Sequence, residues 1–211
     1  MEYQEWLKKR KAGIGGSDAS AILGMNPYKT NVELWEEKTG RREPEDISGK
    51  PYVQYGKEAE EPLRKLFALD HPQYDVIHNG DYEMHISEKQ PFIFGTFDGT
   101  LVEKETGAVG VLEIKTTNIL QSMQREKWSD KIPDNYYIQI LHYMLVKDFQ
   151  FAKLKAHLIS QWNNEVRITQ RHYHIERDEV AEDLKYLEAE EIKFWEYVKK
   201  DKRPPLRLPT I

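Results

Sequence analysis

Apolar residues recur at helical spacing in several parts of the chain. The longest such segment, 178–200, is predicted to be an amphipathic helix that ends before Pro204-Pro205. A second helix is expected over 57–69, with Pro62 in or near its first turns. Shorter helices are expected at 17–23, from the cap residue Thr30 to Gly40, at 119–128 and at 135–146.

Other segments are short, rich in β-branched or aromatic residues and bounded by turn residues, as strands are. Strands are expected at 75–85, 92–102, 109–116, 154–161 and 166–175, and the last two form a hairpin that turns at Asn163-Asn164. The order of helices, strand meander, helix, hairpin and helix predicts a mixed α/β (α+β) fold, in which helices flank a central mixed sheet.

At 211 residues, 39% of them hydrophobic and 32% charged, the chain is expected to form one domain, residues 1–211, with a sizeable core. No apolar run approaches the length needed to span a bilayer, and the first residues lack the apolar stretch of a secretory signal. The absence of cysteine excludes disulfides, zinc–thiolate sites and iron–sulfur clusters. A soluble protein of the reducing cytoplasm, without a membrane partner, is therefore expected.

The formal net charge of −5 argues against a protein that coats DNA non-specifically. It does not argue against a nuclease, because metal-binding carboxylates add negative charge and local basic patches can carry the phosphate contacts. Basic runs occur at 8–11, 41–42 and 199–203. Since charge runs are usually solvated surface, that interpretation is favoured for each of them.

The main candidate chemistry lies on two neighbouring predicted strands. Glu113 and Lys115 are two residues apart in an apolar, β-rich segment, so they point to one face of the sheet and Ile114 points into the core. Asp98, in Gly95-Thr96-Phe97-Asp98-Gly99, is expected at the end of the neighbouring strand. Two carboxylates suit a hard divalent cation such as Mg²⁺, and a lysine can polarise water or neutralise a scissile phosphate. Alone, Glu-x-Lys is usually a solvated ion pair, but here the charges interrupt a core strand.

A second candidate site lies near the N-terminus. Gly15-Gly16 would leave N–H groups free at the start of the following helix, where an anion could bind. Arg10 could reach a phosphate there bidentately, and the Ser17 hydroxyl could donate to it. Simple N-capping by Ser17 or Asp18 is the structural alternative, and on this motif alone it is preferred.

Two further polar residues lie on predicted helices. Glu60 borders the apolar face of its helix and could point at the metal pocket, or it could be an ordinary glutamate of a first helical turn. Gln139 lies in an apolar helix and needs partners if it is buried: the site lysine, a water or a nucleotide. His142 is expected to be a satisfied core histidine. The aromatic residues expected in the core rather than as stacking platforms are Tyr136, Tyr137 and Tyr143.

Five motifs occur in order along most of the chain, from about Trp6 to Trp195. They are Gly13-Ile-Gly-Gly-Ser-Asp-Ala-Ser-Ala-Ile-Leu-Gly24, Tyr55-Gly-Lys-Glu-Ala-Glu60, Gly95-Thr-Phe-Asp98-Gly99, Leu112-Glu113-Ile-Lys115-Thr116, and Pro133 followed by Tyr136-Tyr-Ile-Gln139. Together they resemble the lambda exonuclease or YqaJ-like viral recombinase family of the PD-(D/E)XK nuclease superfamily. The resemblance implies a restriction-endonuclease-like core.

The resemblance also implies residue roles. Asp98 and Glu113 resemble the metal-binding carboxylates, and the Ile114 carbonyl resembles a backbone metal ligand. Lys115 resembles the catalytic lysine that activates water. Glu60 resembles the helix carboxylate beside the metals.

Further roles follow from the same resemblance. Arg10 and Ser17 keep the spacing of the family's arginine and serine that hold the 5′-phosphate of the DNA end, and Thr96 occupies a position that often carries a small hydroxyl residue. Gln139 matches the first glutamine of the helix, whereas Leu141 stands where lambda exonuclease has a second one. Phe97 rather than proline precedes Asp98.

The function that the resemblance implies is a Mg²⁺-dependent exonuclease, with Mn²⁺ as a substitute, that degrades one strand of linear duplex DNA from its end, 5′ to 3′. It also implies a ring-shaped homotrimer, a single-strand annealing protein as partner, and a phage or prophage protein of the bacterial cytoplasm. The residues alone indicate only a metal-dependent phosphodiesterase. An endonuclease on the same core is disfavoured by the Arg10 and Ser17 pocket. A silent DNA-binding or assembly protein is disfavoured by the retained acidic residues and lysine.

Overall fold

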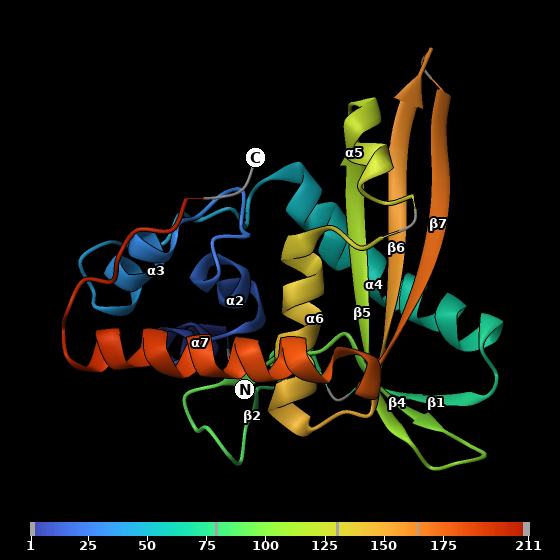
Figure 1. Cartoon of the computed structure of the whole chain (residues 1–211). Coiled ribbons are helices and arrows are strands. Elements are labelled where there is room, and N and C mark those ends of the chain that lie inside the picture. The colour runs from blue at the N-terminus through green and yellow to red at the C-terminus, as the bar shows by residue number, and fades with distance from the viewer. Residues whose placement is uncertain (1–2, 79, 130, 164, 209–211) are drawn as a thin grey trace.

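The computed structural model describes residues 3–78, 80–129, 131–163 and 165–208 (Figure 1). Its helices are α1 (Tyr3–Lys11), α2 (Gly16–Ile22), α3 (Asn31–Lys38), α4 (Pro51–Asp70), α5 (Ser122–Glu126), α6 (Asp134–Lys147), the 3₁₀ turn η1 (Asp178–Val180) and α7 (Ala181–Lys199). Its strands are β1 (Tyr74–Ile77), β2 (His85–Ile86), β3 (Phe94–Gly95), β4 (Gly99–Glu103), β5 (Val109–Ile119), β6 (Phe151–Trp162) and β7 (Glu165–Glu176).

Five of the strands form a mixed sheet in the order β1-β4-β5-β6-β7. Strands β5 and β6 run parallel, joined by a crossover through α6, and the other neighbours are antiparallel. Strands β2 and β3 form a separate antiparallel pair. The long β6–β7 hairpin extends well beyond β1 and β4 (Figure 1). This arrangement confirms the predicted central mixed sheet flanked by helices.

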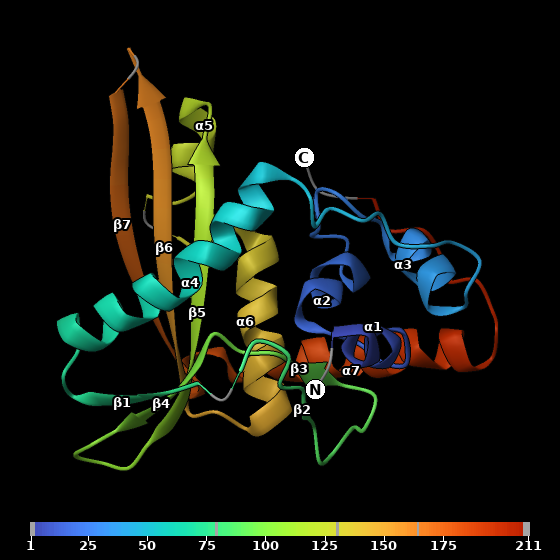
Figure 2. The same cartoon turned by 180° about the vertical axis from the view of Figure 1, so that it is seen from behind.

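Helices α6 and α4 cover opposite faces of the sheet (Figures 1 and 2). On the α6 face, Ile140 and Met144 pack with Leu154 of β6 in the largest core cluster. On the α4 face, Leu63 and Phe67 pack against residues of β4 and β5. Helices α2, α3 and α7 share a third apolar cluster beside α6. The middle of strand β5 is therefore covered on both faces, and Glu113 there is buried.

The helix α1 was not predicted from the sequence. It is only nine residues long and carries four basic residues in its last turn, so its apolar pattern is weak. Helix α4 was predicted too short, because it begins at Pro51 in the first helical position, which suits proline. Pro62 therefore lies inside the helix, and the expectation that it lies near the first turns was wrong. Pro62 and Glu58 are exposed, so water can bind the carbonyl that the proline leaves without an N–H donor.

The predicted strand at 92–102 is interrupted. Strand β3 ends at Gly95 and β4 begins at Gly99, so Asp98 precedes a strand instead of ending one. The cause is a tertiary contact: Ile14 donates its N–H to Phe92 O at 2.6 Å and accepts from Phe94 N at 3.0 Å. This contact ties the chain before β4 to the glycine motif of residues 13–16.

Other boundaries also differ from expectation. The segment 75–85 contains parts of two short strands, β1 and β2. The helix predicted at 119–128 shrinks to α5, because β5 continues to Ile119, which pairs with Ser160 of β6. The hairpin is confirmed, and Asn163 at its turn has a φ of 47°, a conformation that asparagine tolerates. Asn164 lies outside the described residues.

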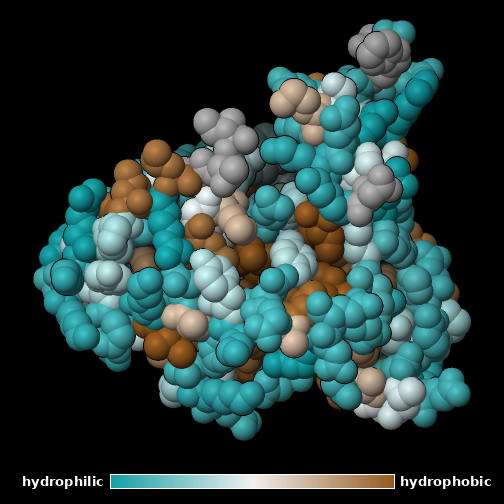
Figure 3. Space-filling model, in the orientation of Figure 1, coloured by the Kyte–Doolittle hydropathy of each residue, from teal (hydrophilic) through white to brown (hydrophobic). Residues whose placement is uncertain are grey.

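The basic runs pair with acidic residues on the surface. Lys11 lies 2.7 Å from Glu43, Arg42 lies 2.7 Å from Glu33, and Lys199 and Lys200 both contact Glu196. Hydrophilic side chains cover most of the face in Figure 3, with apolar ones gathered near its middle. The interpretation of these runs as solvated surface is therefore supported. Within the described residues, no helix is both long and apolar enough to cross a membrane.

Candidate active site

Glu113 and Lys115 lie side by side on the α6 face of β5. The Lys115 Nζ is 2.5 Å from Glu113 Oε1, and the Gln139 side chain donates to the same oxygen at 3.0 Å. Only 3% of the Glu113 side chain is exposed, against 21% for Lys115. Ile114 points the other way, into the cluster under α4. Strand alternation thus places a buried carboxylate and a partly exposed ammonium group on one face of β5, where the Gln139 amide of α6 meets the carboxylate.

Asp98 reaches the same point from the turn before β4. The pairing of β4 with β5 ends at Gly99 and Leu112, and the Asp98 Oδ2 accepts the N–H of Ile114 at 2.6 Å. The N–H and C=O of one strand residue point to the same edge, so the Ile114 carbonyl also faces the Asp98 side. Arg64 of α4 holds the turn in place by donating to the Asp98 carbonyl at 2.8 Å.

Burial of the site disfavours the ionised forms of its two carboxyl groups, Glu113 and Asp98. Burial raises the pKa of Glu113 to about 8, and the charge of Asp98 adds to the shift. Burial likewise raises the pKa of Asp98, although Lys115 and the Ile114 N–H oppose it. Burial lowers the pKa of Lys115, but Glu113 and then Tyr143 and Asp98 together outweigh this and the net shift is upward. Lys115 is therefore an ammonium group at neutral pH.

These residues suit a hard divalent cation. Two carboxylates and a backbone carbonyl are oxygen ligands of the kind that Mg²⁺ prefers, and a cation would offset the cost of ionising two buried carboxyl groups, whose pKa values burial raises. Among the described residues, no three histidine, aspartate or glutamate side chains converge into a ready-made cage. The donor set available is therefore Asp98, Glu113 and the Ile114 carbonyl.

Glu60 of α4 is close enough to this site for the charges of Asp98 and Lys115 to shift its pKa. Burial raises the pKa of Glu60 to about 7, and the charge of Asp98 raises it further whereas Lys115 lowers it. Glu60 and Arg64 line a pocket of about 720 Å³ between α4 and residues 76–78 and 80–81. Asp81, across this pocket, also raises the pKa of Glu60. Glu60 is thus set in the interior of a helix, and not in its first turn as one interpretation held.

Gln139 joins the site to the N-terminal glycine motif. Its amide donates both to Glu113 and to the hydroxyl of Tyr143, at 2.7 Å for the latter. The Tyr143 ring packs directly on Gly16, where an added Cβ would lie 2.5 Å from the ring. Gly16 is therefore required by this close approach. Tyr143 is buried, as expected, but it also takes part in the polar network of the site.

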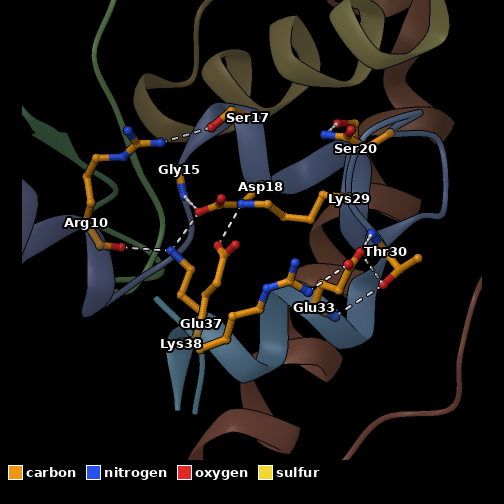
Figure 4. Close-up of polar contacts among 12 residues, drawn as sticks. Arg10, Gly15, Ser17, Asp18, Ser20, Lys29, Thr30, Glu33, Glu37 and Lys38 are labelled. Atoms are coloured by element: carbon orange, nitrogen blue, oxygen red, sulfur yellow. Dashed lines mark hydrogen bonds and ion pairs between the residues drawn. The ribbon is translucent and has the colours of Figure 1, made fainter. Parts of the chain in front are cut away.

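Arg10 and Ser17 are brought together next to that contact. The Arg10 Nη2 donates to Ser17 Oγ at 3.0 Å (Figure 4). The guanidinium lies 4.7 Å from the Trp6 ring centroid. The Trp6 ring N–H donates to Thr96 Oγ1 at 3.2 Å. Ser17 is exposed and Arg10 is half-buried. The three residues predicted to bind a phosphate thus form one cluster, joined by Trp6.

The role predicted for the Gly15 N–H was wrong. That N–H donates to Asp18 Oδ2 at 3.1 Å, so it is not free for an anion. Gly15 occupies the N-cap position, and Ser17 does not cap the helix. Asp18 supplies the capping hydrogen bond from within the first turn. The preferred structural alternative was correct in assigning a capping role to Asp18, and the role of the Arg10 and Ser17 side chains as anion ligands stays a prediction.

His142 is a satisfied core histidine, as predicted. Its side chain is fully buried, with Nδ1 2.7 Å from Glu191 Oε1 and Nε2 2.7 Å from the Phe94 carbonyl. Leu141 is also fully buried, in the main core cluster, and takes no part in the site. Tyr136 and Tyr137 are only partly buried, and Tyr136 lies 5.3 Å from the Lys115 Nζ by its ring centroid. The expectation of a core role holds for Tyr143 better than for these two.

Several residues of the site were not found from the sequence: Trp6, Asp18 as a buried charge, Arg64 and Tyr143 as a hydrogen-bonding group. Arg64 lies on the helical turn after Glu60, which is the one local signal that could have indicated it. Trp6 and Thr96 are 90 residues apart, and no local pattern relates them.

Comparisons with known proteins agree with this architecture. Residues 5–150 match the YqaJ-like viral recombinase domain. The chain is 32% identical over 211 residues to the uncharacterized protein YqaJ of Bacillus subtilis (strain 168), covering 92% of this chain and 56% of that protein. It thus spans about half the length of this relative.

Two solved structures are similar in fold. An alkaline exonuclease (LHK-Exo) from Laribacter hongkongensis matches with a TM-score of 0.65 and 16% identity, over 94% of this chain and 93% of that one. A phage-related exonuclease from Haemophilus somnus 129PT matches with a TM-score of 0.54 and 18% identity, over 90% and 96%. At these identities the likeness shows the fold alone. With more than half of its residues matched by the family, the chain belongs to the YqaJ-like viral recombinase domain family.

Proposed function

We propose that this chain is a Mg²⁺-dependent nuclease that degrades one strand of linear duplex DNA from its end, in the 5′ to 3′ direction. Mn²⁺ is expected to substitute for Mg²⁺. The observation that carries the proposal is the convergence of Asp98, Glu113 and Lys115 beside the Arg10–Ser17 cluster. The family and the fold shared with exonucleases support it.

Each residue of the site has a role in this proposal. Asp98, Glu113 and the Ile114 carbonyl would hold the cation, which when bound stabilises negative charge on the scissile phosphate. Lys115, kept charged by Glu113, donates a hydrogen bond to the attacking water or to the phosphate and does not act as a base. Gln139 fixes the Glu113 carboxylate, and Glu60 adds a further carboxylate beside Asp98.

The Arg10–Ser17 cluster would hold the terminal 5′-phosphate of the DNA. A guanidinium group binds phosphate through charge-assisted hydrogen bonds, and the exposed Ser17 hydroxyl can add another. Thr96 holds Trp6, on whose ring the Arg10 guanidinium stacks. Because Gly16 packs on Tyr143, which bonds Gln139, this cluster adjoins the carboxylates. A bound end would therefore place a nearby phosphodiester at the cation site.

The decisive experiment compares end-labelled linear duplex with closed circular duplex, with and without Mg²⁺. We expect release of nucleotides from the linear substrate only, and only with the cation. Cleavage of the circle would favour the alternative, an endonuclease on the same core. Absence of cleavage under all conditions, with DNA binding retained, would favour a silent DNA-binding or assembly protein.

We also propose that the chain acts as a homotrimeric ring and works with a single-strand annealing protein. The family, which is one of viral recombinases, supports this pairing. Light scattering after size exclusion should give the mass of three 25.0 kDa chains. The annealing protein should co-purify with this chain both with and without DNA. A monomer in solution would contradict the ring.

A further inference from the structure

A buried ion pair lies behind Arg10 and Ser17. The Lys38 Nζ of α3 is 2.7 Å from Asp18 Oδ2 of α2, and these side chains are only 6% and 7% exposed. The same Nζ donates to the backbone carbonyl of Arg10, also at 2.7 Å. Figure 4 shows the two ends of Arg10 held separately: the carbonyl points at Lys38 and the guanidinium points at Ser17. Lys38 thus joins the end of α1, at the Arg10 carbonyl, to the start of α2, at Asp18.

Asp18 is a potential competitor for Arg10. Burial raises the pKa of Asp18, but the charges of Lys38 and then of Arg10 more than offset this, so the carboxyl group is ionised. The Asp18 Oδ2 also accepts the Gly15 N–H, which fixes the carboxylate within reach of the Arg10 charge. With Lys38 removed, Arg10 would be the cation left to neutralise Asp18. A guanidinium paired with a carboxylate binds phosphate less well, because its charge is already compensated.

We propose that Lys38 is a positioning residue that sets the specificity for a 5′-phosphate, by occupying the Asp18 carboxylate and so keeping the Arg10 guanidinium beside Ser17. This inference rests on the proposed function of the Arg10–Ser17 cluster. Lys38 itself is buried and bonded to protein atoms on two sides, so it acts through Arg10 and does not contact the DNA.

The test measures kcat and KM on two duplexes of one sequence, one with a 5′-phosphate and one with a 5′-hydroxyl. Wild type should prefer the phosphate on the order of ten- to a hundredfold. Lys38→Met, which keeps the length and apolar stem of the side chain, should lose most of this preference through a higher KM for phosphorylated ends. Lys38→Met combined with Asp18→Asn should regain it, because no carboxylate remains to compete for Arg10.

Further variants separate positioning from stability. Lys29→Met is the matched control, since Lys29 pairs with Glu37 at 2.6 Å in the same region without touching Arg10 or Asp18. It should leave the preference unchanged. Lys38→Arg should keep most of the preference, because a cation still faces Asp18. Asp18→Asn alone should keep the preference even though it is less stable, since it leaves Lys38 buried without its counter-ion. Melting temperatures of all variants accompany the kinetics.

Each outcome decides the matter. A Lys38→Met protein that keeps the wild-type preference would overturn the inference. The inference would also be overturned if Lys38→Met were slowed equally on both ends and the double variant with Asp18→Asn did not recover the wild-type rate. That result would indicate a structural role for Lys38. If Lys38→Met does not fold, loss of the preference in Asp18→Asn overturns the inference and retention supports it. A wild type that treats both ends alike would instead overturn the 5′-phosphate pocket of the proposed function, and this inference with it.

Discussion

The Nζ atom of Lys115 and the side-chain amide of Gln139 both bind Oε1 of Glu113, at 2.5 and 3.0 Å. One oxygen of the buried carboxylate is thus held from two elements, β5 and α6. These two contacts fix the orientation of the carboxylate. The pKa of Lys115 is raised, because Glu113 and the other acidic groups around the lysine together outweigh the effect of burial.

Lys115→Ala should therefore lower the rate of DNA cleavage while the variant still binds Mg²⁺. The lost group is a charged donor aimed at the reacting phosphate or water, and removal of such a donor costs on the order of 10² to 10³ in kcat. Single-turnover kinetics with saturating DNA would give the rate, and calorimetric titration with Mg²⁺ would give the binding. Loss of Mg²⁺ binding would mean that Lys115 chiefly assembles the carboxylates.

Asp98→Ala and Glu113→Ala should each abolish Mg²⁺-dependent cleavage and leave the fold intact. Each substitution also breaks favourable contacts, because Glu113→Ala leaves Lys115 without its counter-ion and Asp98→Ala leaves the Ile114 N–H without its acceptor. The expected results are no product from linear duplex, an unchanged circular dichroism spectrum and a melting temperature below that of wild type. Full activity with Mg²⁺ in either variant would contradict the assignment of that residue as a ligand.

Mg²⁺ binding should tighten as the pH rises. The pKa of Glu113 is raised to about 8 and that of Glu60 to about 7, so without metal the folded protein binds protons that the unfolded chain, near 4.5, has already lost. The stability of the metal-free protein therefore falls as the pH rises from about 4.5 to about 8. Mg²⁺ must displace these protons, so its apparent affinity should rise over the upper part of this range and then level off.

Melting temperatures between pH 5 and 9, with and without Mg²⁺, test this prediction. Glu113→Gln is the control, because its side chain can still accept from Lys115 and Gln139 but does not titrate. The metal-free wild type should lose stability with rising pH more steeply than Glu113→Gln, and Mg²⁺ should stabilise wild type increasingly toward pH 8. Parallel curves for the two proteins would show that Glu113 is ionised at neutral pH without a cation.

The local sequence pattern predicted how Glu113 and Lys115 lie on β5. It did not predict the parts of the site that depend on tertiary contacts. Alternation along one strand is a property of neighbouring residues, so the shared face of Glu113 and Lys115 could be read from the sequence. The break before Asp98 could not, because it depends on Ile14 pairing with Phe92 and Phe94 from far along the chain. Helix α1 could not be predicted from the sequence either, because its apolar pattern is weak. The hydrogen bond from Trp6 to Thr96 forms only in the folded protein.

The glycine motif illustrates a different limit. Its glycines were interpreted as exposing N–H groups to an anion, which is one reason for glycine at a helix start. The structure gives another: Gly16 makes room for Tyr143, and the Gly15 N–H is already bonded to Asp18. Both reasons produce the same sequence. Only the identity of the residue facing each glycine, which comes from α6 for Gly16, distinguishes them.

Glu191→Gln should destabilise the protein although it lies outside the site. Both ring nitrogens of His142 face acceptors, the Glu191 carboxylate and the Phe94 carbonyl, and only the protonated imidazolium can donate to both. Burial lowers the pKa of His142, but the charge of Glu191 and the hydrogen bonds to Glu191 and to the Phe94 carbonyl together outweigh this, and the net pKa is raised. Removing one partner of such a fully buried pair costs about 3–5 kcal/mol. Urea unfolding at pH 6 measures the loss.

The same pair predicts a pH dependence with a defined sign. Because the folded pKa of His142 lies above the unfolded value of about 6.5, its contribution is complete below that value and is lost as the pH rises through the folded pKa. With saturating Mg²⁺, which suppresses the titration of Glu113, wild type should lose stability on the alkaline side more than Glu191→Gln does. An equal alkaline slope in both proteins would show that His142 is neutral and the pair is not ionic.

Arg10→Ala should erase most of the preference for 5′-phosphorylated ends. The guanidinium donates to Ser17 and stacks on Trp6, so it is held in place for a terminal phosphate. A charge-assisted contact of this kind is worth roughly 1.5–3 kcal/mol, on the order of ten- to a hundredfold in binding. The variant should digest phosphorylated duplex slowly and with shorter runs, and should differ little from wild type on hydroxyl ends.

The measurement compares the digestion rates of wild type and Arg10→Ala on the two kinds of end. Lys9→Ala is the matched control, because Lys9 pairs with Glu5 on the exposed side of the same helix. Equal slowing of Arg10→Ala on both ends would reject the pocket, and would leave Arg10 as a general contact to the DNA backbone or as a support for α1.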